Sequence, residues 1–276
     1  MTGDTRVRVG LTLPSFAEDP EVPITIARAA ETAGLDGVFV FDHLFRRAAD
    51  GTRRPALEAM ALLGAVAAET TRVRVGTLVA RASLRPAATL GAALETVQRV
   101  SRGRLIVGVG AGDEESREEN ESFGIPFGTM ADRVAELAAA VDAARGRGFP
   151  VWVGGTARAV RDVAAERADG WNRWGGTAAR FASHARELAD RVGARPFTLS
   201  WGGLVVVRDE ATPARDAAER LGAGAHALVG SPQEVARALR AYREAGATWI
   251  VLGPVDSADP ANAERVASVR AALGES

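Results

Sequence analysis

The chain alternates between short runs of apolar residues and longer stretches in which apolar positions recur with helical spacing. Short apolar runs that lack a polar alternation are typical of strands buried on both faces. We therefore expect strands at residues 7–13, 37–41, 73–79, 104–109, 149–153, 170–172, 198–207 and 249–252.

Helical patterns separate these runs, and several of them carry recognisable ends. Gly34 and Gly246 each follow a periodic stretch, which is where a helix-terminating glycine stands. The segment 231–234, Ser-Pro-Gln-Glu, combines a capping serine, a first-turn proline and the glutamate of a capping box. The sequence predicts helices at residues 20–33, 56–69, 86–100, 130–145, 157–167, 178–192, 213–221, 231–245 and 260–273.

This alternation of strand and helix predicts parallel strands that are joined by helical crossovers. Eight strands favour a closed (β/α)₈ TIM barrel, and an open doubly wound sheet is the alternative. Such barrels usually run to about 250 residues as one domain. The chain has 276 residues, so we expect residues 1–276 to form a single catalytic domain of the α/β class.

The composition is 47% hydrophobic and 25% charged, which suits a globular protein with a sizeable core. A formal net charge of −1 without a basic stripe argues against nucleic-acid binding. No window approaches about 18 consecutive apolar residues, so we expect no membrane span. The first residues do not resemble a signal peptide, and we expect a cytoplasmic protein.

The missing residue types exclude several classes of chemistry. There is no cysteine and no lysine, because all 34 basic residues are arginine. These absences exclude thiolate nucleophiles, disulfides, Schiff-base and pyridoxal phosphate chemistry, and P-loop nucleotide binding. Only His43, His184 and His226 are present, and none pairs with another at metal-ligand spacing, so we expect no metal site.

The pair Asp42-His43 directly follows the second expected strand, where a (β/α)₈ barrel builds its active site. A histidine there can act as a general acid or base near neutral pH, and a neighbouring carboxylate can tune or orient it. The alternative is that His43 only completes a hydrogen-bond network. His184 falls in an expected outer helix and His226 in a late loop, so a structural role is favoured for both.

The end of the third expected strand offers two interpretations. Thr77, Leu78 and Val79 would form a platform for a flat ring, or they would simply fill the barrel as strand residues. After the sixth strand, Asn172 and Trp174 add a polar and an aromatic group to the mouth.

The fourth expected strand ends in a glycine-rich stretch with Gly110 and Gly112 before Asp113. Spaced glycines let a ligand approach the backbone, although the pattern is not the dinucleotide-binding fingerprint. A long loop, residues 110–129, follows and is most simply a solvated segment, with a mobile lid as the alternative. It carries Glu114, Glu115, Glu118, Glu119 and Glu121.

Residues 154–158, Gly-Gly-Thr-Ala-Arg, open an expected helix after the fifth strand. Free N–H groups at a helix start, a hydroxyl and a guanidinium together favour an anion site. We interpret this segment as a phosphate site, and a tight turn with Thr156 as N-cap is the alternative. The candidate ligands are Gly154, Gly155, Thr156 and Arg158.

Taken in order and at their spacing, these segments resemble the luciferase-like monooxygenase superfamily, and within it the oxidoreductases that depend on coenzyme F420, a deazaflavin. The resemblance covers nearly the whole chain. It is carried by residues 30–37, 42–43, 73–77, 102–112, 151–155, 168–172, 230–235 and 242–247.

The resemblance implies a role for each matching position. His43 would lie near the reactive ring carbon of the coenzyme, with Asp42 beside it. A bulge that often contains a non-prolyl cis peptide would back the ring, here at Leu78–Val79. The ring edge would be lined by Gly110, Gly112 and Asp113, and the phosphate would be held by Gly154, Gly155 and Thr156.

The chain also departs from parts of the family. The sugar-phosphate dehydrogenases carry a glutamate where Asp113 stands, a tryptophan soon after the histidine and lysines near the phosphate. Here residues 44–46 are Leu-Phe-Arg, and there is no lysine. These differences argue against a sugar phosphate as substrate, and the lack of the large luciferase insertion argues against light emission.

The resemblance therefore implies two-electron hydride transfer between F420 and a small organic substrate, with His43 as proton donor or acceptor. One alternative is an FMN-dependent monooxygenase that uses O₂ and is supplied with reduced flavin by a separate reductase. An alternative of another class is a non-catalytic flavin-binding protein, against which the Asp42-His43 pair argues. The family likeness also implies a homodimer.

Overall fold

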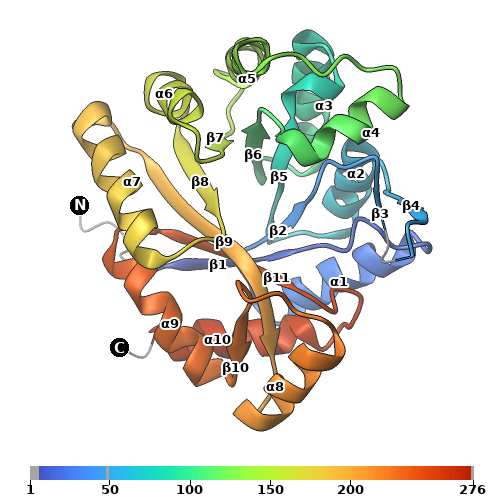
Figure 1. Cartoon of the computed structure of the whole chain (residues 1–276), viewed down its shortest axis with the longest axis vertical. Coiled ribbons are helices and arrows are strands. Elements are labelled where there is room, and N and C mark those ends of the chain that lie inside the picture. The colour runs from blue at the N-terminus through green and yellow to red at the C-terminus, as the bar shows by residue number, and fades with distance from the viewer. Residues whose placement is uncertain (1–5, 48–49, 275–276) are drawn as a thin grey trace.

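The computed structural model describes residues 6–47 and 50–274, in which parallel strands close into a barrel (Figure 1). The last strand of the ring, β11, pairs with the first, β1, and every neighbouring pair is parallel. The expected (β/α)₈ fold is thus confirmed. In spatial order the ring contains β1 (Arg8–Thr12), β2 (Gly37–Val40), β5 (Arg74–Arg81), β6 (Leu105–Gly110), β7 (Val151–Gly154), β8 (Gly170–Trp174), β9 (Thr198–Val207) and β11 (Trp249–Pro254).

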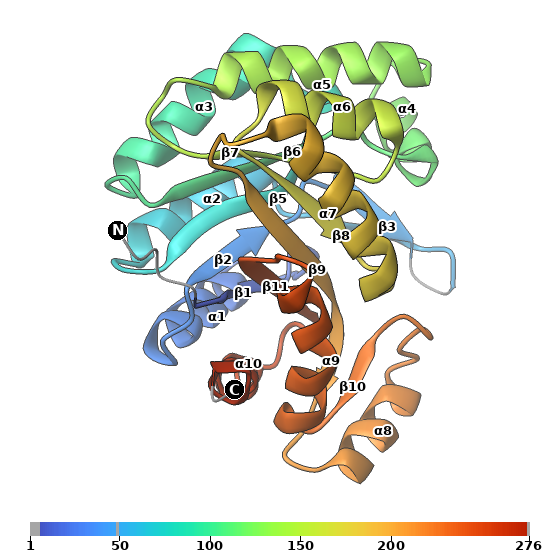
Figure 2. The same ribbon diagram turned by 90° about the vertical axis from the view of Figure 1, so that its left-hand side faces the viewer.

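Helices surround the ring on its outside (Figures 1 and 2). Each expected helix is present, with ends that lie within a turn of the prediction. The capping box is formed, since Ser231 Oγ accepts from Glu234 N–H and the Glu234 carboxylate accepts from Ser231 N–H. The helices are α1 (Glu21–Thr32), α2 (Ala59–Glu69), α3 (Ala87–Val100), α5 (Met130–Ala144), α6 (Arg158–Arg167), α7 (Ala178–Val192), α8 (Ala211–Arg220), α9 (Pro232–Glu244) and α10 (Asn262–Gly274).

Short elements that the apolar pattern does not signal complete the fold. An antiparallel hairpin of β3 and β4 follows β2, and β10 pairs with β9 outside the ring. The stretch 110–129, which we expected to be an open loop, contains the 3₁₀ turn η2 and the helix α4. These elements are β3 (Phe45–Arg47), β4 (Arg53–Pro55), η1 (Ala82–Leu84), η2 (Glu114–Ser116), α4 (Arg117–Ser122) and β10 (Leu228–Gly230).

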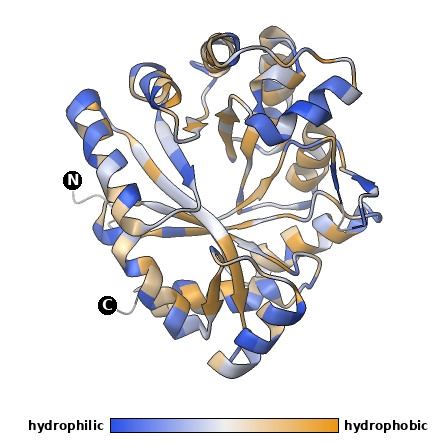
Figure 3. Cartoon of the chain, in the orientation of Figure 1, coloured by the Kyte–Doolittle hydropathy of each residue, from blue (hydrophilic) through white to orange (hydrophobic). Residues whose placement is uncertain are grey.

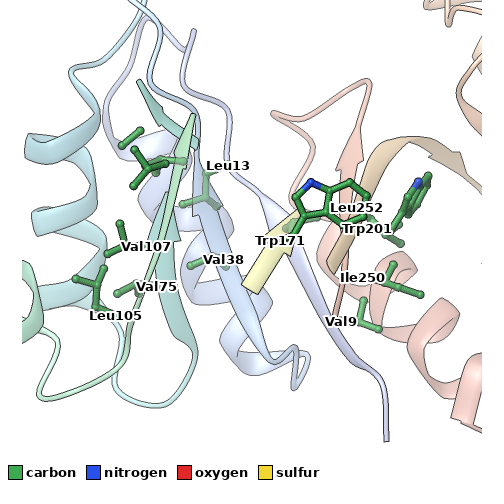
Figure 4. Close-up of a cluster of buried hydrophobic side chains, with 14 of the residues drawn as sticks. Val9, Leu13, Val38, Val75, Leu105, Val107, Trp171, Trp201, Ile250 and Leu252 are labelled. Atoms are coloured by element: carbon green, nitrogen blue, oxygen red, sulfur yellow. The ribbon is translucent and has the colours of Figure 1, made fainter. Parts of the chain in front are cut away.

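The strands bury side chains on both faces, which explains their nearly continuous apolar runs. One set of side chains packs between the barrel and the helices and includes Val9, Val38 and Val107 (Figure 4). A second cluster of large side chains fills the inside of the barrel, namely Phe39, Leu78, Ile106, Trp152, Trp249 and Val251.

Glycines on neighbouring strands make room for these interior rings. A Cβ at Gly76 would lie 2.9 Å from the Phe39 ring, and one at Gly170 would lie 2.6 Å from Trp152. Figure 3 shows that the surrounding helices carry both hydrophobic and hydrophilic residues. Within residues 6–47 and 50–274, no helix combines the length and the apolar character needed to cross a membrane.

Candidate active site

A cavity of about 790 Å³ opens at the C-terminal mouth of the barrel. This volume lies within the range of small-molecule sites, about 300–1,000 Å³. Besides Trp174 at the end of β8, the cavity brings together six residues that the sequence singled out, from the segments after β2 and β6 and from the end of β5. They are Asp42, His43, Leu78, Val79, Gly112 and Asp113.

His43 contributes a partly exposed imidazole to this cavity, with 39% of its side chain accessible. Its Nδ1 lies 2.7 Å from Oε1 of Glu119. The ring packs near two phenylalanines, with its centroid 5.7 Å from that of Phe16 and 6.4 Å from that of Phe41. The imidazole is therefore held by one carboxylate and two aromatic rings.

Glu119 is the carboxylate that contacts His43, and its side chain is only 8% exposed. Its second oxygen, Oε2, accepts hydrogen bonds from the Leu44 N–H at 2.8 Å and from Arg81 Nη2 at 3.0 Å. Burial alone would raise the pKa of Glu119, but the hydrogen bonds from His43 and Leu44 hold it below its usual value. Glu119 is therefore ionised at neutral pH.

Asp42 does not orient His43, which corrects the expectation drawn from their adjacency. Its buried carboxylate accepts from the Arg81 N–H at 2.9 Å and from Arg85, whose Nη1 and Nη2 lie at 2.7 and 3.1 Å. Asp42 thus anchors the end of β5 and Arg85. The partner of His43 is Glu119, which lies 76 positions further along the chain.

The acidic stretch that we expected to be solvated is docked against the hairpin instead. Ser116, Glu119 and Asn120 are buried. Glu118 accepts from Arg47 and Arg53, and these two guanidinium groups lower the pKa of Glu118 to about 2. Exposed ion pairs of this kind contribute little each, but together they fasten α4 to β3 and β4 beside the cavity.

The end of β5 contains the expected bulge, with the register shifting between Thr77 and Ala80. The peptide bond between Leu78 and Val79 is cis, as the resemblance implied. Thr77 is fully buried, and its hydroxyl donates to the Gly108 carbonyl at 2.7 Å. Leu78 and Val79 therefore line the cavity, whereas Thr77 is a structural residue of the barrel wall.

Gly110 and Gly154 accommodate a side chain of the chain itself. A Cβ at Gly110 would lie 2.5 Å from Val79 Cγ2, and a Cβ at Gly154 would lie 2.5 Å from Val79 Cγ1. The space above these two glycines is thus filled by Val79. Gly112 differs, because a Cβ there would meet nothing closer than 3.8 Å. Of these three glycines, Gly112 is the one that lines the cavity.

The proposed phosphate segment lies at the open start of α6. Thr156 does not cap this helix, because the N-cap is Ala157 and makes no side-chain hydrogen bond. The Gly155 N–H donates to the Asn172 carbonyl at 3.2 Å, and the Asn172 side chain donates to Ser200 at 2.9 Å. Asn172 is buried and serves the barrel wall.

Arg158 lines a different cavity from that of His43. This second cavity has a volume of about 540 Å³, is open to the surface and is lined by charged side chains of α6 and α7, namely Arg158, Arg161, Asp162, Glu187 and Arg191. His184 Nδ1 accepts a hydrogen bond from Arg173 Nη1 at 3.1 Å, and the ring packs edge-on against Trp171, which fits the structural role we favoured.

Apolar and aromatic side chains form the rest of the His43 cavity. Trp174, which is 37% exposed, lies over two glycines, since a Cβ would fall 2.6 Å from its ring at Gly202 and 3.1 Å at Gly253. It meets Phe41 edge-on at 5.6 Å. In the part of the chain that is described, no group of three or more metal-ligating side chains is placed to hold an ion.

Comparison with known proteins gives a matching family model, curated relatives and solved structures. A family model described as "Luciferase-like monooxygenase" matches residues 5–226. An F420-dependent glucose-6-phosphate dehydrogenase of Beutenbergia cavernae is 38% identical over 137 residues, which is 49% of this chain and 39% of that protein. The match thus spans less than half the length of that relative.

Solved structures with the same fold extend over nearly the whole chain. An F420-dependent secondary alcohol dehydrogenase, solved with an F420–acetone adduct, superposes with a TM-score of 0.80 at 16% identity and covers 97% of this chain and 99% of that one. The monooxygenase RslO1 of Streptomyces bottropensis superposes with a TM-score of 0.75 at 19% identity and covers 97% and 98%. At these identities the likeness establishes the fold.

Proposed function

Because the chain belongs to the luciferase-like monooxygenase family, we propose that it is an oxidoreductase that uses coenzyme F420 for hydride transfer to or from a small organic substrate. The observation that carries this proposal is the placement of His43 in the mouth cavity together with the Leu78–Val79 bulge. Residues 1–276 would act as one catalytic domain, and the active form would be a homodimer.

The residues around the cavity fit a flat deazaflavin ring. Leu78 and Val79 offer an apolar floor, and Phe41 and Trp174 add aromatic surface. Gly112 also lines the cavity without adding a side chain, and Asp113 is exposed next to it. When bound, the coenzyme supplies a ring carbon that takes up or releases a hydride, while the protein supplies orientation and proton transfer.

The start of α6 would hold the coenzyme phosphate. Its first N–H groups carry no side-chain cap, and Thr156 and Arg158 are exposed beside them. Free N–H groups at a helix start and an arginine favour a phosphate. Gly155 allows the turn before α6, because its φ of 136° is a conformation that a residue with a side chain rarely adopts.

His43 would handle the proton of the reaction. When an alcohol is oxidised, its hydroxyl proton would pass to the imidazole while the carbinol carbon gives up a hydride to the coenzyme. When a carbonyl is reduced, the same proton would return to the oxygen. A general acid or base of this kind is worth about 10²–10⁴ in rate.

The pairing of charges in the cavity favours an uncharged substrate. Asp42 is paired with Arg85, Glu119 with Arg81, and Glu118 with Arg47 and Arg53. Most guanidinium groups at the mouth are thus already neutralised by carboxylates of the chain. We therefore propose an apolar alcohol, ketone or electron-poor alkene, not a sugar phosphate.

Anaerobic mixing of the protein with reduced F420 and a panel of ketones and enones tests this function. We expect oxidation of the coenzyme with at least one member, and a rate about 10²–10⁴ lower in His43→Asn at an unchanged coenzyme Kd. Equal rates in the two proteins would contradict the role of His43. Oxygen uptake with reduced FMN, and no reaction with F420, would point instead to the FMN-dependent monooxygenase and its separate reductase.

A further inference from the structure

The two ring nitrogens of His43 have different surroundings. Nδ1 lies 2.7 Å from Glu119 Oε1. Within residues 6–47 and 50–274, no hydrogen bond reaches Nε2, although the ring lines the cavity. One nitrogen is thus occupied by the protein, and the other is left for a ligand.

The state of Glu119 decides which nitrogen carries the proton. Its Oε2 already accepts from Leu44 N–H and from the positively charged Arg81 Nη2, and this contact with a guanidinium favours the ionised carboxylate. An ionised carboxylate has acceptors only. At 2.7 Å from Glu119 Oε1, Nδ1 must therefore be the donor, so a neutral His43 carries its proton on Nδ1.

We propose that Glu119 is a positioning residue that fixes neutral His43 as the Nδ1–H tautomer, so that Nε2 is the atom that exchanges the proton with substrate. The inference rests on the proposed function. In alcohol oxidation the hydroxyl proton would bind the Nε2 lone pair, the hydride would leave the carbinol carbon for the coenzyme, and the resulting imidazolium would face the Glu119 carboxylate.

The buried charge of Arg81 gives the Glu119 carboxylate a second role. Its side chain is 4% exposed, and its Nε and Nη1 have no hydrogen-bond partner among the described residues. Without the charge of Glu119, this buried guanidinium would disfavour a positive charge on the neighbouring imidazole. Glu119 therefore both orients His43 and balances Arg81 when His43 takes up a proton.

Glu119 reaches His43 only because α4 is docked. The neighbouring Glu118 pairs with Arg47 and Arg53, and Asn120 donates to Ser83 Oγ at 3.1 Å. These contacts flank Glu119 on the same helix. They fix the depth at which its carboxylate enters the cavity wall.

The ¹⁵N resonances of the imidazole nitrogens test the tautomer directly, in the protein without coenzyme or substrate. The chain has three histidines, so the His43 signals are assigned by their loss in His43→Asn. We expect a protonated Nδ1 and an unprotonated Nε2 in the wild type, and loss of that preference in Glu119→Gln. Glu121→Gln is the matched control, because Glu121 lies on the same helix and only pairs with exposed Arg117 at 3.7 Å.

A wild-type Nε2–H tautomer, or the same tautomer populations in Glu119→Gln, would overturn the inference. Kinetics provide a second readout, in which kcat of Glu119→Gln falls about 10²-fold at unchanged KM for coenzyme and Glu119→Asp restores part of it. An unchanged kcat in Glu119→Gln would also overturn it. A protein that shows the predicted tautomers but does not react with F420 would refute the proposed function alone.

Discussion

Replacing Gly154 by alanine tests how the bulge at the end of β5 packs against β7. The new Cβ would lie 2.5 Å from Val79 Cγ1, with the Val79 Cβ and Cγ2 at 3.7 Å. Carbon atoms in contact prefer about 3.5–4.0 Å. The valine or the strand must therefore move by about 1 Å, and overpacking of this kind usually costs about 1–3 kcal/mol.

A double-mutant cycle isolates this contact. Val79→Ala removes two methyl groups from a half-buried side chain, which should cost about 1 kcal/mol at about 0.8 kcal/mol per buried carbon. In Gly154→Ala/Val79→Ala, the alanine methyl at 154 occupies the space that the valine has left. The double variant should then be about as stable as Val79→Ala alone, which gives a coupling energy of about 1–3 kcal/mol.

Urea denaturation of the four proteins measures the cycle. Gly64→Ala serves as control, because it lies within α2 and a Cβ there meets nothing within 4 Å. This control should be more stable than the wild type by about 0.5–1 kcal/mol. Additivity of the Gly154 and Val79 substitutions within about 0.5 kcal/mol would refute the contact. Such additivity would support the alternative that Gly154 faces a ligand.

Other predictions concern single contacts away from the cavity. Ser231→Ala should cost about 1 kcal/mol in urea denaturation, because it breaks the capping box of α9. Arg104→Met should cost about 2–4 kcal/mol in the same assay, since four backbone carbonyls lose a charged donor. The N–H groups of residues 71–73 hold the pKa of Glu31 below 4.5 although burial opposes them. The contribution of Glu31 to stability is therefore fully present above pH 4.5 and is lost as its carboxylate becomes protonated on acidification. In pH-dependent melting, the stability advantage of the wild type over Glu31→Gln should shrink below pH 4.5.

The barrel was predictable from the sequence because its strands are buried on both faces. Strands that are buried on both faces need apolar residues at nearly every position, and the helices between them show the helical spacing of apolar positions. The hairpin of β3 and β4 lacks such a signal. Four of its six residues are arginines and it carries little apolar material, so its order comes from contacts with α4.

The site was predictable only where one residue marks a strand end. His43 lies three residues after the end of β2 and was found, but its partner Glu119 lies in a run of glutamates whose composition is that of a solvated loop. Adjacency instead suggested Asp42, which the structure pairs with Arg85. Gly110 and Gly154 show the same limit, because a sequence does not reveal whether a ligand or the valine of another strand fills the space above a glycine.

The central claim is that the mouth of this barrel binds a deazaflavin. Titration of the purified protein with F420 and, separately, with FMN, followed by fluorescence and absorbance, tests it most directly. We predict tight binding of F420 and weak binding of FMN. Tight binding of FMN with no binding of F420 would contradict the account.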